Sequence, residues 1–585
     1  MYLTRLTMVY RMTEQQKTVT VNGERVPLTD IAGFECVFAT YSANKLMDTD
    51  ALVVKEKVHF KDGRVVPNIR VHRDKKWPYY ITREGFRNHK DKKEWEDIHR
   101  LERRTSRRID LARNVARAMG KPLDQTMRQL GDSPYLYGTD ILPSSLIKDM
   151  YEKKWPDAKT LTFDVAALDN EADIVDGTDD ITISNIVYKD KAYTAVTKQY
   201  VGNIDNFIEK VLKKAEETMG DRIKARNLKW EIDIVDNAGE AVWRVLQKAH
   251  EWKPDFISIW NMRYDIPKMV DALTKYNYNV ADAFSDPSVP EEYRLFNWRE
   301  GPAIKVTQSG KKLPLHVAER WHVCTCTASF YFVDAMCLYK RIRTAEGNES
   351  SYALDHILKV KGIPSKLKSE ELSHLEGDSN AWHVEAQKNH RVFYTVYNLQ
   401  DDIALLDLDN KIGDISRAFP GLAGISDYSL FTRQPRKIAD DLHFYVLDKG
   451  KVIASTPQDI ANDPLNKYVL GLGDWIITLP SYMIDNGMYA FKDAPNIRTM
   501  IYRYLADLDI AATYPTGEDT LNISKETTKF ETSLFKGYTE QERRYFGLTL
   551  TTGKSSALEL GVRYLKMPTP EQLVAQYDED FKDAA

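Results

Sequence analysis

The chain has 585 residues, of which 43% are hydrophobic and 29% charged, a balance typical of a folded globular protein rather than a disordered one. Its formal net charge of -4 excludes a simple cationic nucleic-acid binder, and its four cysteines are too few for a disulfide framework. The sequence shows no secretory signal and no run of about 18 apolar residues that would cross a membrane. We therefore expect a cytoplasmic protein, without membrane association, that has about three or four domains.

The first 150 residues combine short strand-like runs with a charged stretch near 90–119, which we interpret as a helix that ends at Gly120. From Arg83 to Lys121 there are thirteen Lys or Arg and seven Asp or Glu residues. Such an excess can form a face that neutralises phosphates. A solvated surface crossed by ion pairs is the simpler interpretation of this stretch.

Strands and helices alternate over about 155–412, which predicts a mixed α/β domain. The predicted strands lie at 161–168, 181–188, 192–201, 255–260 and 329–340, and the predicted helices at 204–219, 238–252, 350–362 and 384–411. A further helix has Pro267 in its first turn. A second mixed segment runs to about 480, and a strand with an acidic end follows at 502–516. The fold class predicted for the whole chain is therefore α/β and α+β with several domains.

Three aspartates stand at the ends of apolar elements, namely Asp164, Asp265 and Asp401. At such a position a carboxylate faces a cleft more often than a core, because burial of a lone charge is costly. Tyr397 precedes Asp401 by four residues, so a helix would place both on one face. Each aspartate by itself is more typical of a helix cap or a surface ion pair, and only their order along the chain is specific.

That order resembles the Exo I, Exo II and Exo III motifs of the DnaQ-like 3'→5' proofreading exonuclease, an RNase H-like domain, as it occurs in phage-type family B DNA polymerases. The Exo I pattern D-x-E is matched to Asp164, Val165 and Ala166, Exo II to Asn261, Tyr264 and Asp265, and Exo III to Tyr397 and Asp401. The segment 351–358 between Exo II and Exo III also resembles that family.

The resemblance implies two Mg²⁺ or Mn²⁺ ions about 3.5–4 Å apart, which clamp the attacking and leaving oxygens of a phosphodiester. Asp164 would bridge both ions, Asp401 would help to hold the first, and Asp265 would support the second. Tyr397 would orient the attacking water. The frayed 3' end of the DNA would be held by Asn261 and Tyr264.

One position departs from the Exo I pattern, because Ala166 stands where the family has glutamate. Asp169 and Glu171 lie nearby, but we set them aside as outside the spacing of the motif. Loss of a metal-binding oxygen predicts a disabled exonuclease, through either a deliberate or a natural Glu-to-Ala change. Ala166→Glu should then raise the degradation of single-stranded DNA.

A second acidic site is predicted at 507–516, which resembles motif A of the family B polymerase active site. Asp509 matches the metal-binding aspartate, and Tyr514, Pro515 and Thr516 are in register with the family pattern. The resemblance implies that Asp509 binds two catalytic ions and that Tyr514 stacks under the sugar and selects deoxynucleotides. The alternative is an ordinary strand and turn with an edge aspartate.

Motifs B and C of that family do not follow Asp509, after which 76 residues remain (585 − 509). The Tyr137–Asp140 segment is similar to motif C, but it lacks the paired aspartate and is interpreted as a turn. The resemblance therefore implies the N-terminal portion of a DNA polymerase with an incomplete polymerase site, inactive in synthesis alone. It would be either half of a split polymerase or a shortened polypeptide.

The expected domains are an N-terminal domain (1–154), the exonuclease (155–412), a segment that returns to the N-terminal domain (413–480), and the first part of the palm (481–585). The expected partners are a DNA primer-template, dNTP and a second polypeptide with the fingers, the rest of the palm and the thumb. A sliding clamp is a further candidate partner. The alternatives are a stand-alone 3'→5' exonuclease and a non-catalytic DNA-binding replication factor.

Overall fold

The computed structural model describes residues 18–458 except 91, 161, 307–309, 345–346, 365–366, 368, 376–377 and 419–433, together with three short strands further on. The chain forms two compact units, Met1–Gln458 and Asp459–Ala585. In the second unit, β21 (Thr528–Phe530), β22 (Leu550–Thr552) and β23 (Ser555–Ser556) pair in antiparallel order. The residues predicted for motif A, Asp509, Tyr514, Pro515 and Thr516, lie outside the described residues.

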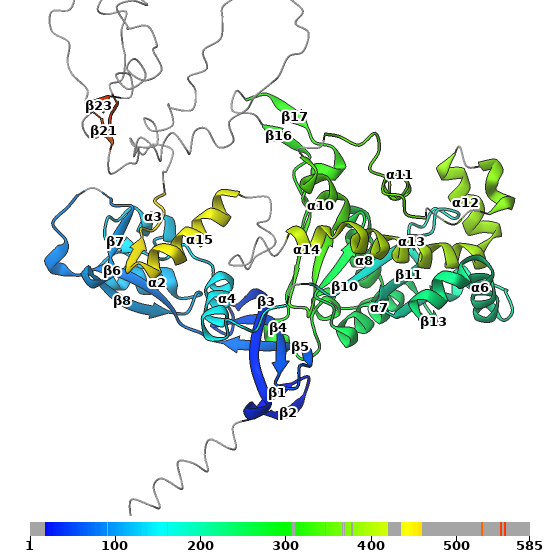
Figure 1. The fold of residues 1–585 in the computed structure, drawn as a ribbon, viewed down its shortest axis with the longest axis horizontal. Coiled ribbons are helices and arrows are strands. Elements are labelled where there is room, and N and C mark those ends of the chain that lie inside the picture. The colour runs from blue at the N-terminus through cyan, green and yellow to red at the C-terminus, as the bar shows by residue number, and fades with distance from the viewer. Residues whose placement is uncertain are drawn as a thin grey trace, which may run out of the picture. The chain divides into compact units, whose positions relative to one another are not determined.

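The first unit begins with an antiparallel sheet (Figure 1). The hairpin of β1 (Thr18–Val21) and β2 (Glu24–Pro27) precedes the long strands β3 (Ile31–Asn44), β4 (Thr49–Phe60) and β5 (Val65–Arg73). Helix α4 (Pro143–Lys154) covers this sheet, with Ile147 and Tyr151 in the same apolar core as Leu52 and Val54. Pro143 fits the first turn of α4 because its missing N–H has no partner there in any helix.

The charged stretch near 90–119 is not the single helix that we predicted. It consists of β7 (Trp95–Asp97), β8 (Leu101–Ser106) and only then a short helix, α2 (Leu111–Ala118). β8 pairs antiparallel with β6 (Trp77–Thr82), and β6 also pairs with β9 (Leu136–Tyr137). Helices α2 and α3 (Met127–Gly131) share an apolar core with this sheet. Sheet pairing here overrides the local helix preference of the Arg-rich and Glu-rich sequence.

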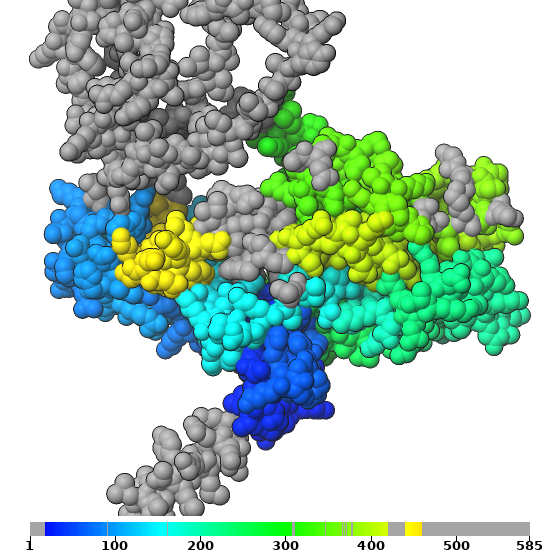
Figure 2. Space-filling view, in the orientation of Figure 1, coloured from blue at the N-terminus to red at the C-terminus, as the bar shows by residue number. Residues whose placement is uncertain are grey.

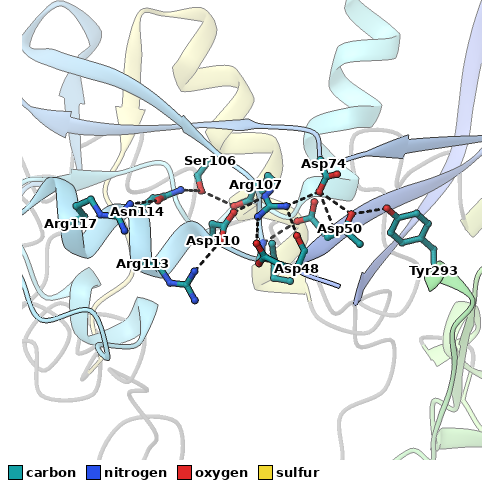
Figure 3. A network of polar contacts seen from close by, with 12 residues as sticks. Asp48, Asp50, Asp74, Ser106, Arg107, Asp110, Arg113, Asn114, Arg117 and Tyr293 are labelled. Atoms are coloured by element: carbon teal, nitrogen blue, oxygen red, sulfur yellow. Dashed lines mark hydrogen bonds and ion pairs between the residues drawn. The ribbon is translucent and has the colours of Figure 1, made fainter. Parts of the chain in front are cut away.

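Basic residues of this stretch take part in ion pairs (Figure 3). Arg107 contacts the carboxylates of Asp48, Asp74 and Asp110 at 3.1, 2.9 and 2.6 Å. On the far side of the same network, the hydroxyls of Thr49 and Tyr293 lie 2.7 Å apart. The network thus joins the β3–β5 sheet to the start of α2 and to residue 293.

The first unit contains a six-stranded mixed sheet, which confirms the predicted mixed α/β class. Its order is β13-β12-β11-β10-β14-β19, with bounds of β10 (Val165–Ala172), β11 (Ile181–Tyr188), β12 (Lys191–Thr197), β13 (Lys229–Val235), β14 (Phe256–Ile259) and β19 (Tyr331–Asp334). β10, β14 and β19 run parallel, whereas β11 is antiparallel to both of its neighbours. Parallel strands end at the same edge of a sheet, so β10 and β14 present their carboxyl ends together.

Helices cover both faces of this sheet (Figure 1). α6 (Phe207–Arg226) and α13 (Arg391–Ile412) share one apolar core with it, and α7 (Ala238–Trp252) and α8 (Met262–Lys275) share the other. The remaining elements of this region are α5 (Lys198–Val201), α9 (Val280–Phe284), β15 (Phe296–Arg299), β16 (Ile304–Val306), β17 (Lys312–Pro314), β18 (Val323–Cys326), α10 (Ala335–Ile342), α11 (Leu354–Val360), α12 (Ser379–Asn389) and α14 (Asp414–Ala418).

After α14 the chain returns to the N-terminal region. β20 (Lys451–Ile453) pairs antiparallel with β7, and Ser145 of α4 donates a hydrogen bond of 2.8 Å to Asp440 in α15 (Gln434–Asp448). Figure 2 shows this segment, in yellow, seated against the blue and cyan residues of the first 150. Among the described residues, no helix has the length and apolarity that crossing a bilayer requires.

Candidate acidic site at the end of the central strand

The central strand β10 sends alternate side chains to opposite faces of the sheet. Ala166 and Leu168 are fully buried in the core that contains α7 and α8. Ala167 lies in the other core, beneath α13, and Asp169 and Glu171 share its side of the strand. Ala166 therefore points away from α13, which carries Asp401, and its position cannot supply the missing metal ligand that we predicted there.

The structure also separates Asp164 from the other predicted residues. Asp164 precedes β10, and its half-exposed carboxylate forms an ion pair of 2.8 Å with Lys189. At about 3.3 Å per residue, five strand residues place Asp164 roughly 16 Å from Asp169. The prediction that Asp164 converges with Asp265 and Asp401 is wrong, because the strand expected at 161–168 runs from 165 to 172 and ends four residues later.

Four other carboxylates gather instead around Asp169, at the carboxyl end of β10. The pKa of Asp169 is raised well above its usual value, first by burial and then by the negative charges of Asp265, Glu171, Asp402 and Asp401. Charges act on one another in this way only when they lie close together. We call Asp169, Glu171, Asp265, Asp401 and Asp402 the acidic cluster. Its members come from β10, from the first turn of α8 and from the middle of α13.

Side-chain amides hold three of these carboxylates in place. Asn398 donates to Asp169 at 2.7 Å, and Asn185 donates to Asp402 at 2.6 Å. Asp265 accepts both the main-chain N–H and the side-chain amide of Asn170, at 3.2 and 3.0 Å. Each of these amides donates a hydrogen bond, which favours the ionised form of its carboxylate without adding a charge.

Tyr397 lies beside the cluster, one turn before Asp401 on α13. The pKa of its phenol is raised, first by burial and then by the charge of Asp401. Tyr264, in the first turn of α8, keeps 41% of its surface exposed, with the Lys268 ammonium 4.7 Å from the centre of its ring. Asn261 precedes α8, and its carbonyl accepts the N–H of Tyr264 at 2.9 Å. Of the residues predicted for Exo II and Exo III, Tyr264 and Tyr397 therefore lie near carboxylates of the cluster, and Asn261 lies just before α8.

Sequence reasoning missed Asp169, Glu171 and Asp402, and a signal for the first two was present. Asp169, Asn170 and Glu171 themselves read D-x-E, so their spacing does satisfy Exo I, contrary to our reason for setting them aside. The structure thereby removes the basis for expecting a disabled exonuclease at Ala166. No such signal identified Asp402, which is fully buried beside Asp401.

The chemistry of the cluster fits hard divalent cations such as Mg²⁺ or Mn²⁺, which prefer carboxylate oxygens. Within the described part of the chain, Oδ1 of Asp402 has no hydrogen-bond partner although it is buried. No three carboxylates of the cluster have ligand oxygens that all lie within 4.8 Å of one another in that same part. Cation binding at this cluster would therefore require the carboxylate oxygens to move closer together.

The pKa of Asp265 predicts how pH affects the stability of the metal-free protein. Burial raises this pKa from 3.8 to about 7, although hydrogen bonds from Asn170 partly oppose the shift. The folded state therefore binds the proton more tightly than the unfolded state, and stability is lost as pH rises between about 4 and 7. In a chelator, thermal melting should occur at a lower temperature at pH 8 than at pH 6, and Asp265→Asn should reduce this difference.

Added Mn²⁺ should reverse this loss, because the cation binds the deprotonated carboxylates. The rise in melting temperature caused by Mn²⁺ should be larger at pH 8 than at pH 6. An equal rise at both pH values, or a rise that survives Asp265→Asn unchanged, would contradict the assignment of the cation to this cluster.

A second set of possible ligands lies apart from the acidic cluster. His322, Asp334 and Cys337 have ligand atoms within 4.8 Å of one another, the one such set in the described ranges. Each already bonds to the main chain: His322 accepts from Gly301 at 3.3 Å, Asp334 from Cys337 at 2.8 Å, and the Cys337 thiol donates to Arg320 at 2.9 Å. Asp334 thus caps α10, which explains why the strand predicted at 329–340 ends at 334.

Comparison of the sequence with known protein families finds no match, and comparison with curated proteins finds none either.

Proposed function

We propose that this chain is a divalent-metal-dependent 3'→5' exonuclease that serves as the proofreading part of a family B DNA polymerase. The observation that carries the proposal is the acidic cluster, in which Asp169 is surrounded by carboxylates from three separate elements. With the assignment corrected, Asp169 and Glu171 match Exo I, Asp265 matches Exo II, and Tyr397 with Asp401 matches Exo III. The Exo I glutamate is thus present, and we infer an intact exonuclease site.

The arrangement of the central sheet supports the same proposal. The acidic residues stand on the central strand β10, between the antiparallel β11 and the parallel β14. In open α/β sheets, ligands bind outside the carboxyl ends of the strands, and this is where the cluster lies. This arrangement is consistent with the RNase H-like fold that the sequence resemblance implies.

Asp169, Glu171, Asp265 and Asp401 would hold the cations. Bound divalent cations supply two things to phosphodiester hydrolysis, a water of lowered pKa and neutralisation of the charge that develops on the leaving oxygen. The Tyr397 phenol is positioned at Asp401, where it can orient a water by hydrogen bonding. The exposed face of Tyr264 offers a platform on which an unpaired terminal base can stack.

DNA synthesis is the second part of the proposal and depends on Asp509 and Tyr514. In this view the chain binds a DNA primer-template and dNTP, and a second polypeptide supplies the fingers, the rest of the palm and the thumb. The alternatives are a nuclease that works alone and a replication factor that binds DNA without cleaving it. A protein that binds single-stranded DNA equally well with and without divalent cations, and does not shorten it, would favour the last of these.

The exonuclease can be tested on the purified full chain with single-stranded DNA labelled at its 5' end. In Mg²⁺ or Mn²⁺ we expect a ladder of labelled products that shortens one nucleotide at a time, because removal begins at the 3' end. A chelator should stop the reaction. A circular single strand of the same sequence has no 3' end and should remain intact, so cleavage of the circle would contradict exonuclease action.

A further inference from the structure

The phenol of Tyr394, a residue outside the three Exo motifs, contacts the acidic cluster. Its hydroxyl donates to Oε2 of Glu171 at 2.5 Å, and its side chain is fully buried. Tyr394 lies one turn before Tyr397 on α13, and the two rings stack with centroids 5.5 Å apart and planes 11° apart. Glu171 is thus oriented by a rigid aromatic side chain rather than by an amide.

Two residues of α12 in turn hold the Tyr394 hydroxyl. His383 Nδ1 lies 2.8 Å from the hydroxyl oxygen, and the side-chain amide of Gln387 donates to that oxygen at 3.3 Å. A tyrosine hydroxyl has one proton, and Tyr394 uses it in the hydrogen bond that it donates to Glu171. The same oxygen must therefore accept from His383, which assigns a proton to Nδ1 of the histidine.

Gln387 also fixes α12 to the end of β10. Its amide nitrogen donates to the carbonyl of Ala172 at 2.8 Å, and its amide oxygen accepts the N–H of Ile174 at 3.2 Å. The strand residue that follows Glu171 is therefore bonded to the same helix that holds Tyr394. Side chain and main chain are constrained together at the position where a cation would bind.

We infer that Tyr394 and His383 are positioning residues that orient the Glu171 carboxylate for cation binding. This inference rests on the proposed function. Partners that orient metal ligands typically change metal affinity or activity by about 10–100-fold when they are removed. A hydrogen bond donated to a carboxylate also favours its charged form, which is the form that binds a cation in a site already rich in negative charge.

The test uses Tyr394→Phe in the full chain, which keeps the ring and removes the hydroxyl. We expect the dissociation constant for Mn²⁺, measured by calorimetry for the sites that Asp265→Ala eliminates, to rise about 10–100-fold. The kcat for single-stranded DNA should fall by a similar factor, whereas KM for DNA should stay unchanged. A residue that only fills the core would lower thermal stability and leave Mn²⁺ affinity as it is.

Variants at His383 test the second residue without altering the tyrosine. His383→Asn retains an N–H close to the position of Nδ1, and His383→Leu does not. We expect His383→Leu to reproduce the Tyr394→Phe defect and His383→Asn to recover most of the Mn²⁺ affinity. Equal losses in the two variants would overturn the role of His383.

The matched control is Tyr193→Phe. Its hydroxyl also donates to a carboxylate, that of Asp233 at 2.8 Å, in the same sheet but outside the acidic cluster. This variant should retain wild-type Mn²⁺ affinity and kcat. Wild-type values in Tyr394→Phe would overturn the inference. A wild-type chain that binds Mn²⁺ but does not degrade DNA would overturn the proposed function, and the Mn²⁺ titrations would still decide the positioning role.

Discussion

Glu171→Ala should lower Mg²⁺-dependent degradation of single-stranded DNA by about 10³-fold, whereas Asp164→Ala should leave the rate unchanged. Glu171 belongs to the acidic cluster, and a metal ligand contributes several kcal/mol to the charge stabilisation of the transition state. A loss of about 4 kcal/mol corresponds to about 10³-fold in rate. The measurement is the single-turnover rate on labelled single-stranded DNA, with melting temperature recorded for each variant.

Asp164→Ala is the matched control because it also removes one carboxylate near the same strand. The ion pair of Asp164 with Lys189 is half-exposed, and exposed pairs contribute about 0–1 kcal/mol to stability. Ala166→Glu should not raise activity, since it places a carboxylate in a closed apolar core and should destabilise the fold. The opposite pattern, with Asp164→Ala inactive and Glu171→Ala active, would restore the Exo I assignment made from the sequence.

The error at Exo I has a physical cause in the composition of β10. Its apolar part, Val165–Leu168, looks like the end of a short buried strand, because Asp169, Asn170 and Glu171 interrupt the apolar run. The structure continues the strand through these residues, which pair with Asn185, Ser184 and Ile183 of β11. A strand that carries a functional site violates the apolar pattern there, so pattern reading ends the strand where the site begins.

Elements without such a conflict were predictable from the sequence. The bounds of β11 (Ile181–Tyr188) and α7 (Ala238–Trp252) coincide with the predicted ranges, because apolar periodicity and flanking turn residues agree there. Tyr397 and Asp401 follow helical spacing and do lie together. The positioning amides were not predictable, since nothing in the sequence distinguishes Asn185 or Asn398 from other buried asparagines before the sheet and α13 are packed together.

Asp255→Ala should destabilise the protein by about 3–5 kcal/mol, the usual cost of removing one partner from a buried ion pair. The Asp255 carboxylate lies 2.6 Å from the Lys57 ammonium and 3.8 Å from that of Lys55, and all three side chains are buried. It also accepts the main-chain N–H of Asp164 at 2.9 Å. Strand β4 of the N-terminal sheet is thereby joined to the start of β14, and urea unfolding should show the loss.

The pH dependence of this loss provides a second measurement. Burial lowers the pKa of Lys55 to about 8, although Asp255 opposes the shift. The folded state therefore binds this proton less tightly than the unfolded state, so the stability it costs is regained as pH rises between about 8 and 10.5. The unfolded state contributes equally to both proteins, and loss of Asp255 should lower the pKa of Lys55 further. The Lys55 part of the Asp255→Ala defect should therefore shrink as pH rises toward about 8, where the wild-type amine loses its own proton.

Asp236→Ala is the control for Asp255→Ala, since its ion pair with Lys198 is two-thirds exposed on both sides. Such an exposed pair contributes little to stability, and its removal should barely shift the urea midpoint at any pH. If Asp255→Ala unfolds at the same urea concentration as Asp236→Ala, the buried pair contributes no more than a surface one. The N-terminal sheet would then be held to the six-stranded sheet by apolar contacts, chiefly those of Val37 and Phe38 with Phe256 and Val333.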